Sequence, residues 1–78
     1  MTEACETVVD ALGTYCPVPI HLLARALDRV PVGALVEVLA DDPLIAVDLP
    51  AWCHRTGHQL LRLDAEGGDF RGVVRRLT

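Results

Sequence analysis

The stretch Gly13-Thr14-Tyr15-Cys16-Pro17-Val18-Pro19-Ile20 joins a β-branched run to a run of residues with helical spacing. After it, apolar residues recur at positions 20, 23, 24, 27 and 30, which is the pattern of one buried helix face. Pro17 suits the first position of a helix, because the amide that proline lacks would have no partner there. We therefore predict a helix from about Pro17 to Arg29, with Cys16 at its N-cap.

This position makes the Cys16 thiol a candidate for sulfur chemistry. The thiolate is the nucleophilic form of cysteine, and a helix N-terminus can lower the thiol pKa from about 8.5 to as little as roughly 3.5. Pro19 weakens that effect, because it has no amide to donate, and Val18 before it is biased away from helical geometry. The two prolines also stiffen the junction between loop and helix. The sequence therefore predicts one exposed nucleophilic thiol on a rigid corner.

Composition limits the size of the fold and its compartment. A chain of 78 residues, 51% of them hydrophobic, predicts one domain near the lower size limit for a self-sufficient core. Residues 1–6, which include Cys5, have no periodicity and are expected to form a loose terminus. No apolar run approaches the ~20 residues of a membrane span and no signal peptide is visible, so we expect a cytoplasmic protein without membrane association. Three cysteines in such a chain are expected to remain free thiols.

The charge balance argues against several classes of function. A net charge of −4, with seven arginines and no lysine, disfavours direct binding of nucleic acid, which depends on phosphate neutralisation. The absence of lysine also excludes a Schiff-base lysine and a Walker-type phosphate site. Cys53, His54 and His58 do not complete a four-ligand set, so neither a metal nor another cofactor is expected.

The remaining pattern predicts the order strand, helix, strand, helix, strand, strand. Strands are expected over residues 7–11, 34–40, 58–64 and 70–77, with a hairpin loop at 65–69 that contains two glycines. Asp42 should cap a second helix with Pro43 at its first position, Pro50 should kink or split that helix, and Gly57 should end it. Right-handed crossovers then place both helices on one face of a mixed four-stranded sheet, an α/β two-layer sandwich.

Apolar spacing assigns residues to the core and to an open sheet face. The helices are expected to bury Ile20, Leu23, Leu27 and Val30, and Ile45, Leu49, Trp52 and Cys53. The strands are expected to bury Val9, Ala11, Val36, Val38 and Leu61, and to present Val8, Leu12, Leu35, Leu39 and Leu60 on the other face. An exposed apolar sheet face suggests a protein contact, which leaves a homodimer open.

Two charged residues are candidate supports of the cysteine loop. Asp10 lies just before the loop and is expected to accept hydrogen bonds from loop amides. Arg25 follows on the first helix, either as a solvated charge near the helix C-terminus or as a partner-binding residue.

The motif Cys16-Pro17-Val18-Pro19 at a strand-to-helix junction resembles that of the TusA/SirA family of small sulfur carriers. The lead-in Val9-Asp10-Ala11-Leu12-Gly13, the basic Arg25, Asp41-Asp42-Pro43 and residues 48–53 extend the likeness over about Val9 to Leu77. Leu12 and Tyr15 stand where members often have a basic residue, and Val18 where an acid is common. These departures bear on partner docking more than on the chemistry.

The resemblance implies a two-layer α/β sandwich and a persulfide relay. A cysteine desulfurase that uses pyridoxal phosphate, or a rhodanese, would place a sulfane sulfur on Cys16, and Pro17 and Pro19 would fix its loop. The acceptors would belong to tRNA thio-modification (tRNA thiolation), molybdenum-cofactor supply or sulfur metabolism such as sulfur oxidation.

The residues leave two other functions open. One is a non-catalytic regulatory or protein-interaction module that uses the open sheet face. The other is a redox thiol pair of Cys16 and Cys53, which would need Cα atoms about 4.4–6.8 Å apart. Cys16 belongs to no Cys-x-x-Cys pair, and Leu22 occupies the position six residues on where a sulfane-binding loop has arginine. A carrier that depends on other enzymes to generate its sulfur therefore agrees best with the sequence.

Overall fold

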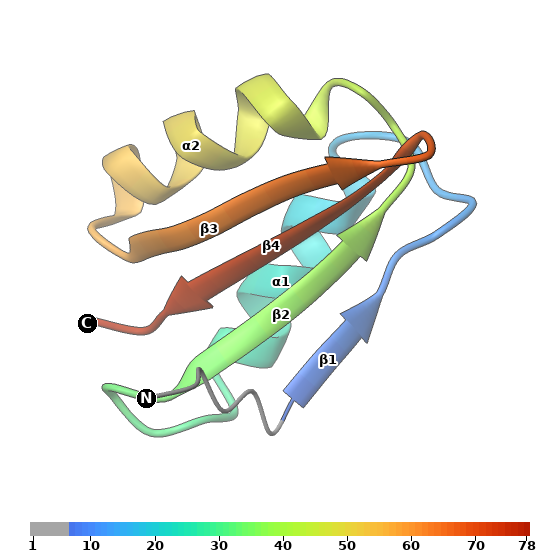
Figure 1. The fold of residues 1–78 in the computed structure, drawn as a ribbon. Coiled ribbons are helices and arrows are strands. Elements are labelled where there is room, and N and C mark those ends of the chain that lie inside the picture. The colour runs from blue at the N-terminus through green and yellow to red at the C-terminus, as the bar shows by residue number, and fades with distance from the viewer. Residues whose placement is uncertain (1–6) are drawn as a thin grey trace.

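A computed structural model describes residues 7–78 as a four-stranded sheet with two helices on one of its faces (Figure 1). The elements are β1 (Thr7–Asp10), α1 (Val18–Leu27), β2 (Leu35–Ala40), α2 (Ile45–Thr56), β3 (Gln59–Glu66) and β4 (Asp69–Arg75). The strands lie in the order β1-β2-β4-β3, with β1 parallel to β2 and the other pairs antiparallel. The expected order and architecture are confirmed. The expected loose terminus and Cys5 lie outside the described residues.

The core lies between the sheet and the two helices. It contains the apolar stripe of each helix and one face of the three longer strands, with these buried members: Ala11, Ile20, Leu23, Leu27, Val36, Val38, Ala40, Ile45, Leu49, Cys53 and Val74. Val30 and Trp52 are half-buried against this cluster. The helix stripes expected from the 3.6-residue period are therefore confirmed. Neither α1 nor α2, the helices of residues 7–78, has the length and apolar content needed to cross a bilayer.

The expected faces of β3 are wrong at its first two leucines. Leu60 pairs with Val74 and packs against the core, and Leu63 does the same opposite Gly72. Between these positions the pairing register shifts at a β-bulge, where Leu61 is the extra residue. A strict alternation of faces along the strand placed Leu61 in the core. The bulge interrupts this alternation, so Leu60 and Leu63 pack against the core instead.

Pro50 was expected to kink or split the second helix. The split is wrong, because the helix is one continuous element from Ile45 to Thr56, and the kink remains a prediction. Proline removes the hydrogen bond to the carbonyl four residues earlier, which here belongs to the exposed Ala46 and can be satisfied by water. The helix ends at Gly57 with φ 85°, as expected, and the Gly57 amide donates to the Cys53 carbonyl at 2.9 Å. The hairpin turn is only Gly67–Gly68, with φ 61° and 89°, so β3 is longer than expected.

Close packing of α2 on the sheet depends on Gly72 of β4. A Cβ atom at this position would lie 2.6 Å from Cδ2 of Leu49 and 3.3 Å from Cγ1 of Val38. Glycine is therefore the residue that lets the Leu49 side chain reach the strand. This contact holds α2, and with it the start of α2, in place over the sheet.

Candidate functional site

Cys16 lies in the turn between β1 and α1, at the edge of the sheet where the parallel strands β1 and β2 both end (Figure 1). The chain that follows β2 leads into α2 at the same edge. The Cys16 side chain is half-buried and packs against the core, and its thiol is free. The thiol therefore lies partly open to solvent, between the starts of the two helices.

The expected N-cap position of Cys16 is wrong by one residue. The first helical residue is Val18, and Pro17 holds the cap position with φ −95° and ψ 15°. The Cys16–Pro17 peptide bond is cis. The amides near the helix start donate to backbone oxygens, Val18 to Tyr15 at 2.9 Å and His21 to Pro17 at 3.1 Å. These amides are therefore committed to the backbone rather than to the thiol.

The two prolines of the motif have different surroundings. Pro17 is exposed, whereas the side chain of Pro19 is fully buried in the first turn of α1. Pro19 has no amide, so the first turn of α1 has one hydrogen-bond donor fewer for a capping group. The role of both prolines in fixing the loop remains a prediction.

Two acids that follow β2 hold the cysteine loop. The Cys16 amide donates to Oδ2 of Asp42 at 2.9 Å, and the Gly13 amide donates to Oδ2 of Asp41 at 2.9 Å. The other oxygen of Asp42 accepts from the Leu44 amide at 3.0 Å. These hydrogen bonds, from Leu44 and then Cys16, hold the pKa of the Asp42 carboxyl below its ordinary value. One carboxylate thus ties the cysteine turn to the start of α2.

The sequence pattern predicted only a capping role for Asp42 and not its hydrogen bond to the Cys16 amide. The expected cap at Asp42 and the expected first position at Pro43 are wrong. The cap residue is Leu44 and the α-helix begins at Ile45, after a turn in which the Ile45 amide donates to the Asp42 carbonyl at 3.0 Å. A signal was present, since the acids directly after β2 and the cysteine loop that follows its parallel neighbour β1 leave the sheet at the same edge.

The expected role of Asp10 in the loop is confirmed as a hydrogen bond. The Leu12 amide donates to Oδ1 of Asp10 at 3.1 Å, and the Thr14 hydroxyl donates to the Ala11 carbonyl at 2.7 Å. These local bonds order the first half of the loop, while the acids after β2 hold its second half. Whether Asp10 contributes to function beyond this remains a prediction.

The electrostatic surroundings of the thiol differ from the expectation of a lowered pKa. Burial, then the negative charges of Asp42 and Asp48, then a hydrogen bond with Asp48, raise the pKa of Cys16 from an ordinary 9.0 to about 11. Asp48 is a half-buried residue of the first turn of α2. The expected lowering of the pKa by the helix N-terminus is wrong: the Val18 and His21 amides bond to backbone oxygens, and the negative charges of Asp42 and Asp48 oppose ionisation of the thiol. At neutral pH about one thiol in 10⁴ is then a thiolate.

Arg25 does not lie beside Cys16. It occupies the last turn of α1, exposed to solvent, and the 1.5 Å rise per residue places it about 10 Å along the axis from Val18. Its partner-binding role therefore remains a prediction, independent of the thiol's own electrostatics.

The structure also places Cys53 and His58, which were candidates for redox chemistry and metal binding. Cys53 is buried in α2 with 3% of its surface exposed, and burial raises the pKa of its thiol to about 11, which disfavours a redox pair with Cys16. The His58 ring lies 5.6 Å from that of Trp52, and its Nδ1 accepts from the Leu77 amide at 3.3 Å. Over residues 7–78, no three His, Cys, Asp or Glu side chains gather as a metal site.

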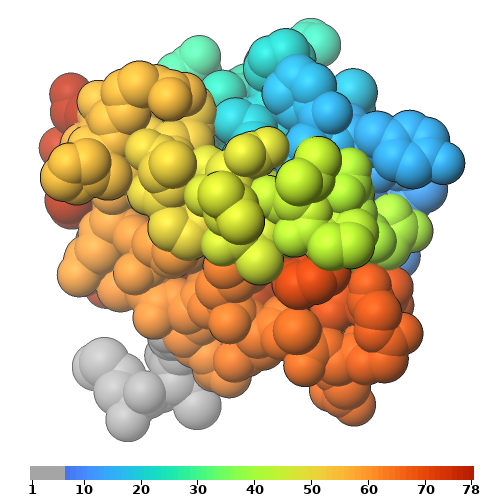
Figure 2. Space-filling model, turned by 90° about the horizontal axis from the view of Figure 1, so that it is seen from above, coloured from blue at the N-terminus to red at the C-terminus, as the bar shows by residue number. Residues whose placement is uncertain are grey.

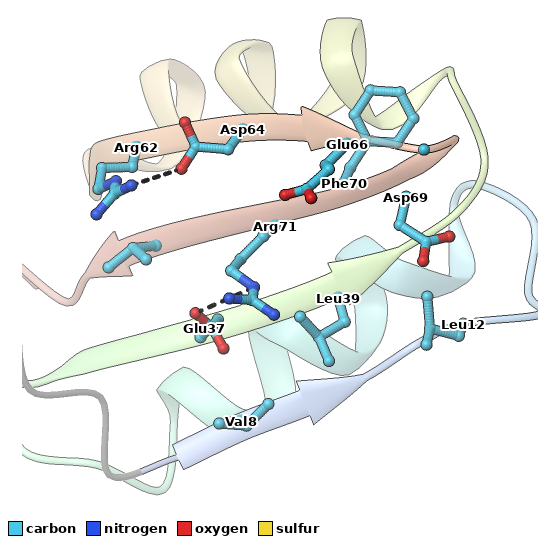
Figure 3. Close-up of a pocket in the computed structure, with 12 residues that line it drawn as sticks. Val8, Leu12, Glu37, Leu39, Arg62, Asp64, Glu66, Asp69, Phe70 and Arg71 are labelled. Carbon is cyan, nitrogen blue, oxygen red and sulfur yellow. Dashed lines mark hydrogen bonds and ion pairs between the residues drawn. The ribbon is translucent and has the colours of Figure 1, made fainter.

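The open face of the sheet is a broad hollow of about 1080 Å³ with mixed chemistry (Figure 3). Val8 and Leu12 are exposed along its β1 side, whereas Leu35 and Leu39 are half-buried. Ion pairs occupy the rest of the face: Arg71 Nε of β4 lies 3.7 Å from Glu37 Oε2 of β2, and Arg62 Nη2 lies 2.9 Å from Asp64 Oδ2 along β3. The expected apolar face is therefore apolar only at one side. The homodimer or partner contact expected of it remains a prediction.

Known proteins resemble this chain in sequence and in the arrangement of sheet and helices. Residues 7–76 match the family model described as Sulfurtransferase TusA. The chain belongs to the TusA family. A putative sulfur carrier protein of Archaeoglobus fulgidus is 43% identical over 70 residues, which cover 90% of this chain and 96% of that protein. The sulfur carrier protein TusA of Pseudomonas syringae pv. syringae is 37% identical over 81 residues, with 97% and 96% covered.

A solved structure has the same fold as this member of the TusA family. The crystal structure of a SirA-like protein from Desulfitobacterium hafniense superposes with a TM-score of 0.78 at 26% identity. The match covers 92% of this chain and 99% of that one. The resemblance inferred from the Cys-Pro-x-Pro motif and its surroundings is therefore confirmed at the level of family and fold.

Proposed function

We propose that this protein is a sulfur carrier that holds a sulfane sulfur on Cys16 as a persulfide and passes it to an acceptor. The observation that carries the proposal is the partly exposed Cys16 thiol, held at the turn before α1 by Asp42. Membership of the TusA family, with relatives named sulfur carrier proteins, supports the same role. In this proposal Pro17 and Pro19 fix the path of the turn, and Asp10 and Arg25 are supporting residues.

Loading is a displacement at sulfur. The Cys16 thiolate attacks the terminal sulfur of a donor persulfide, R–S–SH, so that a new S–S bond forms in Cys16–S–SH and the donor's S–S bond breaks. The donor leaves as a thiolate and takes up a proton equivalent to the one that the Cys16 thiol lost. One thiol and one persulfide are consumed and one of each is formed, so no external oxidant or reductant is needed. Release to an acceptor thiol is the same step in reverse.

The partners of this chemistry are proteins. A cysteine desulfurase or a rhodanese supplies the sulfur, and the acceptor serves tRNA thiolation, molybdenum-cofactor supply or other sulfur metabolism. The acidic net charge opposes direct contact with nucleic acid, so the carrier meets an enzyme rather than the tRNA itself. The free thiols Cys16 and Cys53 agree with a reducing compartment, and the cytoplasm is part of the proposal.

Mass spectrometry of the intact protein tests the proposal. The protein is incubated with cysteine, a cysteine desulfurase and pyridoxal phosphate, and the mass of one added sulfur atom is sought. Wild type and the control Cys5→Ala should gain it, and Cys16→Ala should not. If wild type gains none, or Cys16→Ala gains as much, the carrier proposal is wrong. If Cys16→Ala still supports sulfur delivery to an acceptor, the non-catalytic interaction module is the better account.

A further inference from the structure

Exposed apolar side chains concentrate around Cys16. Eight large hydrophobic residues are exposed in residues 7–78, and four of them flank Cys16 or the start of α2 without lining the open sheet face. We call these four the apolar rim: Tyr15, Val18, Leu44 and Val47. Tyr15 is 79% exposed and Val47 is 67% exposed. Folding leaves these side chains in water, which is unfavourable unless something else covers them.

The two halves of the apolar rim come from distant parts of the chain but belong to one surface. The bonds from Gly13 to Asp41 and from Cys16 to Asp42 fasten the cysteine turn to the chain that enters α2. Figure 2 shows the segment around residues 12–20, in blue, beside the first part of α2, in yellow-green, on the same side of the molecule. Cys16 belongs to the first of these segments, between Tyr15 and Val18, and its amide bonds to Asp42 at the entry to the second.

The charges that act on Cys16 have one sign. Asp42 and Asp48 both oppose ionisation of the thiol, and within residues 7–78 no basic side chain offsets them. The arginines of the sheet belong to the open face, where Arg71 pairs with Glu37 and Arg62 with Asp64. A thiol flanked by an apolar rim and beside two carboxylates is complementary to a surface that is apolar and carries a cation.

We propose that the apolar rim is the docking surface for the protein that exchanges sulfur with Cys16, and that this partner brings an arginine or lysine to Asp42 and Asp48. The inference rests on the proposed carrier function and names the chemistry of the partner. A basic partner also explains how a poorly ionised thiol becomes reactive. A cation beside the carboxylates cancels their effect, and each unit by which the thiol pKa falls raises the thiolate fraction about tenfold. The thiol is then idle in the unbound carrier and active in the docked complex.

Two donors of different size test the apolar rim. A cysteine desulfurase that loads Cys16 needs a docking surface, whereas inorganic polysulfide does not. For Tyr15→Ser/Val47→Ser, the ratio of the desulfurase rate to the polysulfide rate should fall about tenfold or more, through KM, as for loss of interface anchors. The matched control is Val32→Ser, because Val32 is 61% exposed in the connection before β2, far from the cysteine turn. Its ratio should equal that of wild type.

A second experiment tests the charge. Binding to the same desulfurase is measured by calorimetry in the Cys16→Ser background, so that no sulfur is transferred. Adding Asp48→Asn should weaken binding about threefold or more and make it less sensitive to salt, as expected when one charge pair across an interface is lost. The control is Asp28→Asn, which removes a carboxylate at the opposite end of α1.

The outcomes separate the two proposals. If the rim variant keeps the wild-type rate ratio and Val8→Ser lowers it, docking uses the open sheet face and the inference is wrong. If Asp48→Asn leaves binding and its salt dependence unchanged, the partner brings no cation to this site. If neither the desulfurase nor polysulfide loads Cys16, the carrier function itself fails. Tyr15, Val47, Val32 and Val8 are exposed, whereas Asp48 is half-buried, so the unfolding temperature of each variant is measured and should match that of its parent protein.

Discussion

Replacing Asp48 with asparagine should make the Cys16 thiol more reactive at neutral pH. Burial and the carboxylates of Asp42 and Asp48 raise the pKa of this thiol to about 11, and Asp48 contributes both a charge and a hydrogen bond. Asparagine is similar in size but carries no charge. The pKa of the thiol should therefore fall, with the remaining elevation due to burial and Asp42.

The expected reactivity of the wild-type protein follows from the size of the shift. The pKa of Cys16 is raised from 9.0 to about 11, so the fraction of Cys16 that is thiolate at neutral pH is about 100-fold below that of an ordinary cysteine. A more basic thiolate is a better nucleophile, and a Brønsted slope of about 0.4–0.5 recovers roughly 6- to 10-fold of that loss in disulfide exchange. Cys16 should therefore react with a small neutral disulfide about 10- to 20-fold more slowly than an unfolded reference.

The assay follows exchange with 4,4′-dithiodipyridine by absorbance over a range of pH. The protein carries Cys5→Ser, so that the reaction of Cys16 is observed in the presence of the buried Cys53. The reference is a peptide of residues 12–20, which has the same neighbours but no fold. The rate should rise with pH to a midpoint near 11 for the protein, lower for Asp48→Asn, and near the ordinary value for the peptide. A midpoint for the folded protein below that of the peptide would mean that the helix N-terminus outweighs the carboxylates, and would refute the reasoning.

Three further outcomes are expected. Gly72→Ala should destabilise the protein by about 1–3 kcal/mol in urea unfolding, because the new methyl overlaps Leu49; a stability equal to wild type would contradict the close contact. Leu60→Ser should lower the free energy of unfolding more than Leu61→Ser does, and the reverse order would place the bulge elsewhere. The pKa of Asp42 is lowered in the folded state, so its stabilisation is complete above the unfolded value of 3.8 and is lost as pH falls below it. Wild type should therefore lose more stability than Asp42→Asn between about pH 5 and about pH 3 in acid titration followed by circular dichroism.

Local patterns in the chain were sufficient to predict the architecture. The apolar stripes of α1 and α2 follow from a 3.6-residue period, and Gly57 and Gly67–Gly68 end elements because positive φ favours glycine. The handedness of the two crossovers then determines which face the helices cover. Cys16 was identified as the candidate site from its immediate neighbours, because a cysteine followed by prolines at a strand-to-helix junction is itself a local feature.

Interactions between distant residues were not predictable in the same way. The bulge at Leu61 depends on how β3 pairs with β4, and the requirement for glycine at position 72 depends on a leucine of α2. The hydrogen bond from the Cys16 amide to Asp42 joins residues 26 positions apart, and no periodic pattern in the sequence predicts it. For this reason the expected direction of the thiol pKa shift was wrong. A helix N-terminus can be recognised from neighbouring residues in the sequence, whereas a carboxylate from a distant part of the chain cannot.

By itself, then, the sequence determined the order of the elements, the buried faces of the helices and the identity of the candidate cysteine, because each depends on residues within one or two helical turns. Only the tertiary structure decided what surrounds that cysteine. Two parallel strands end at the same sheet edge, and this brings Asp42, Asp48 and the apolar rim to the thiol. Charges and apolar surfaces act through distance in space, so the chemistry of the site depends on the packing that sets those distances.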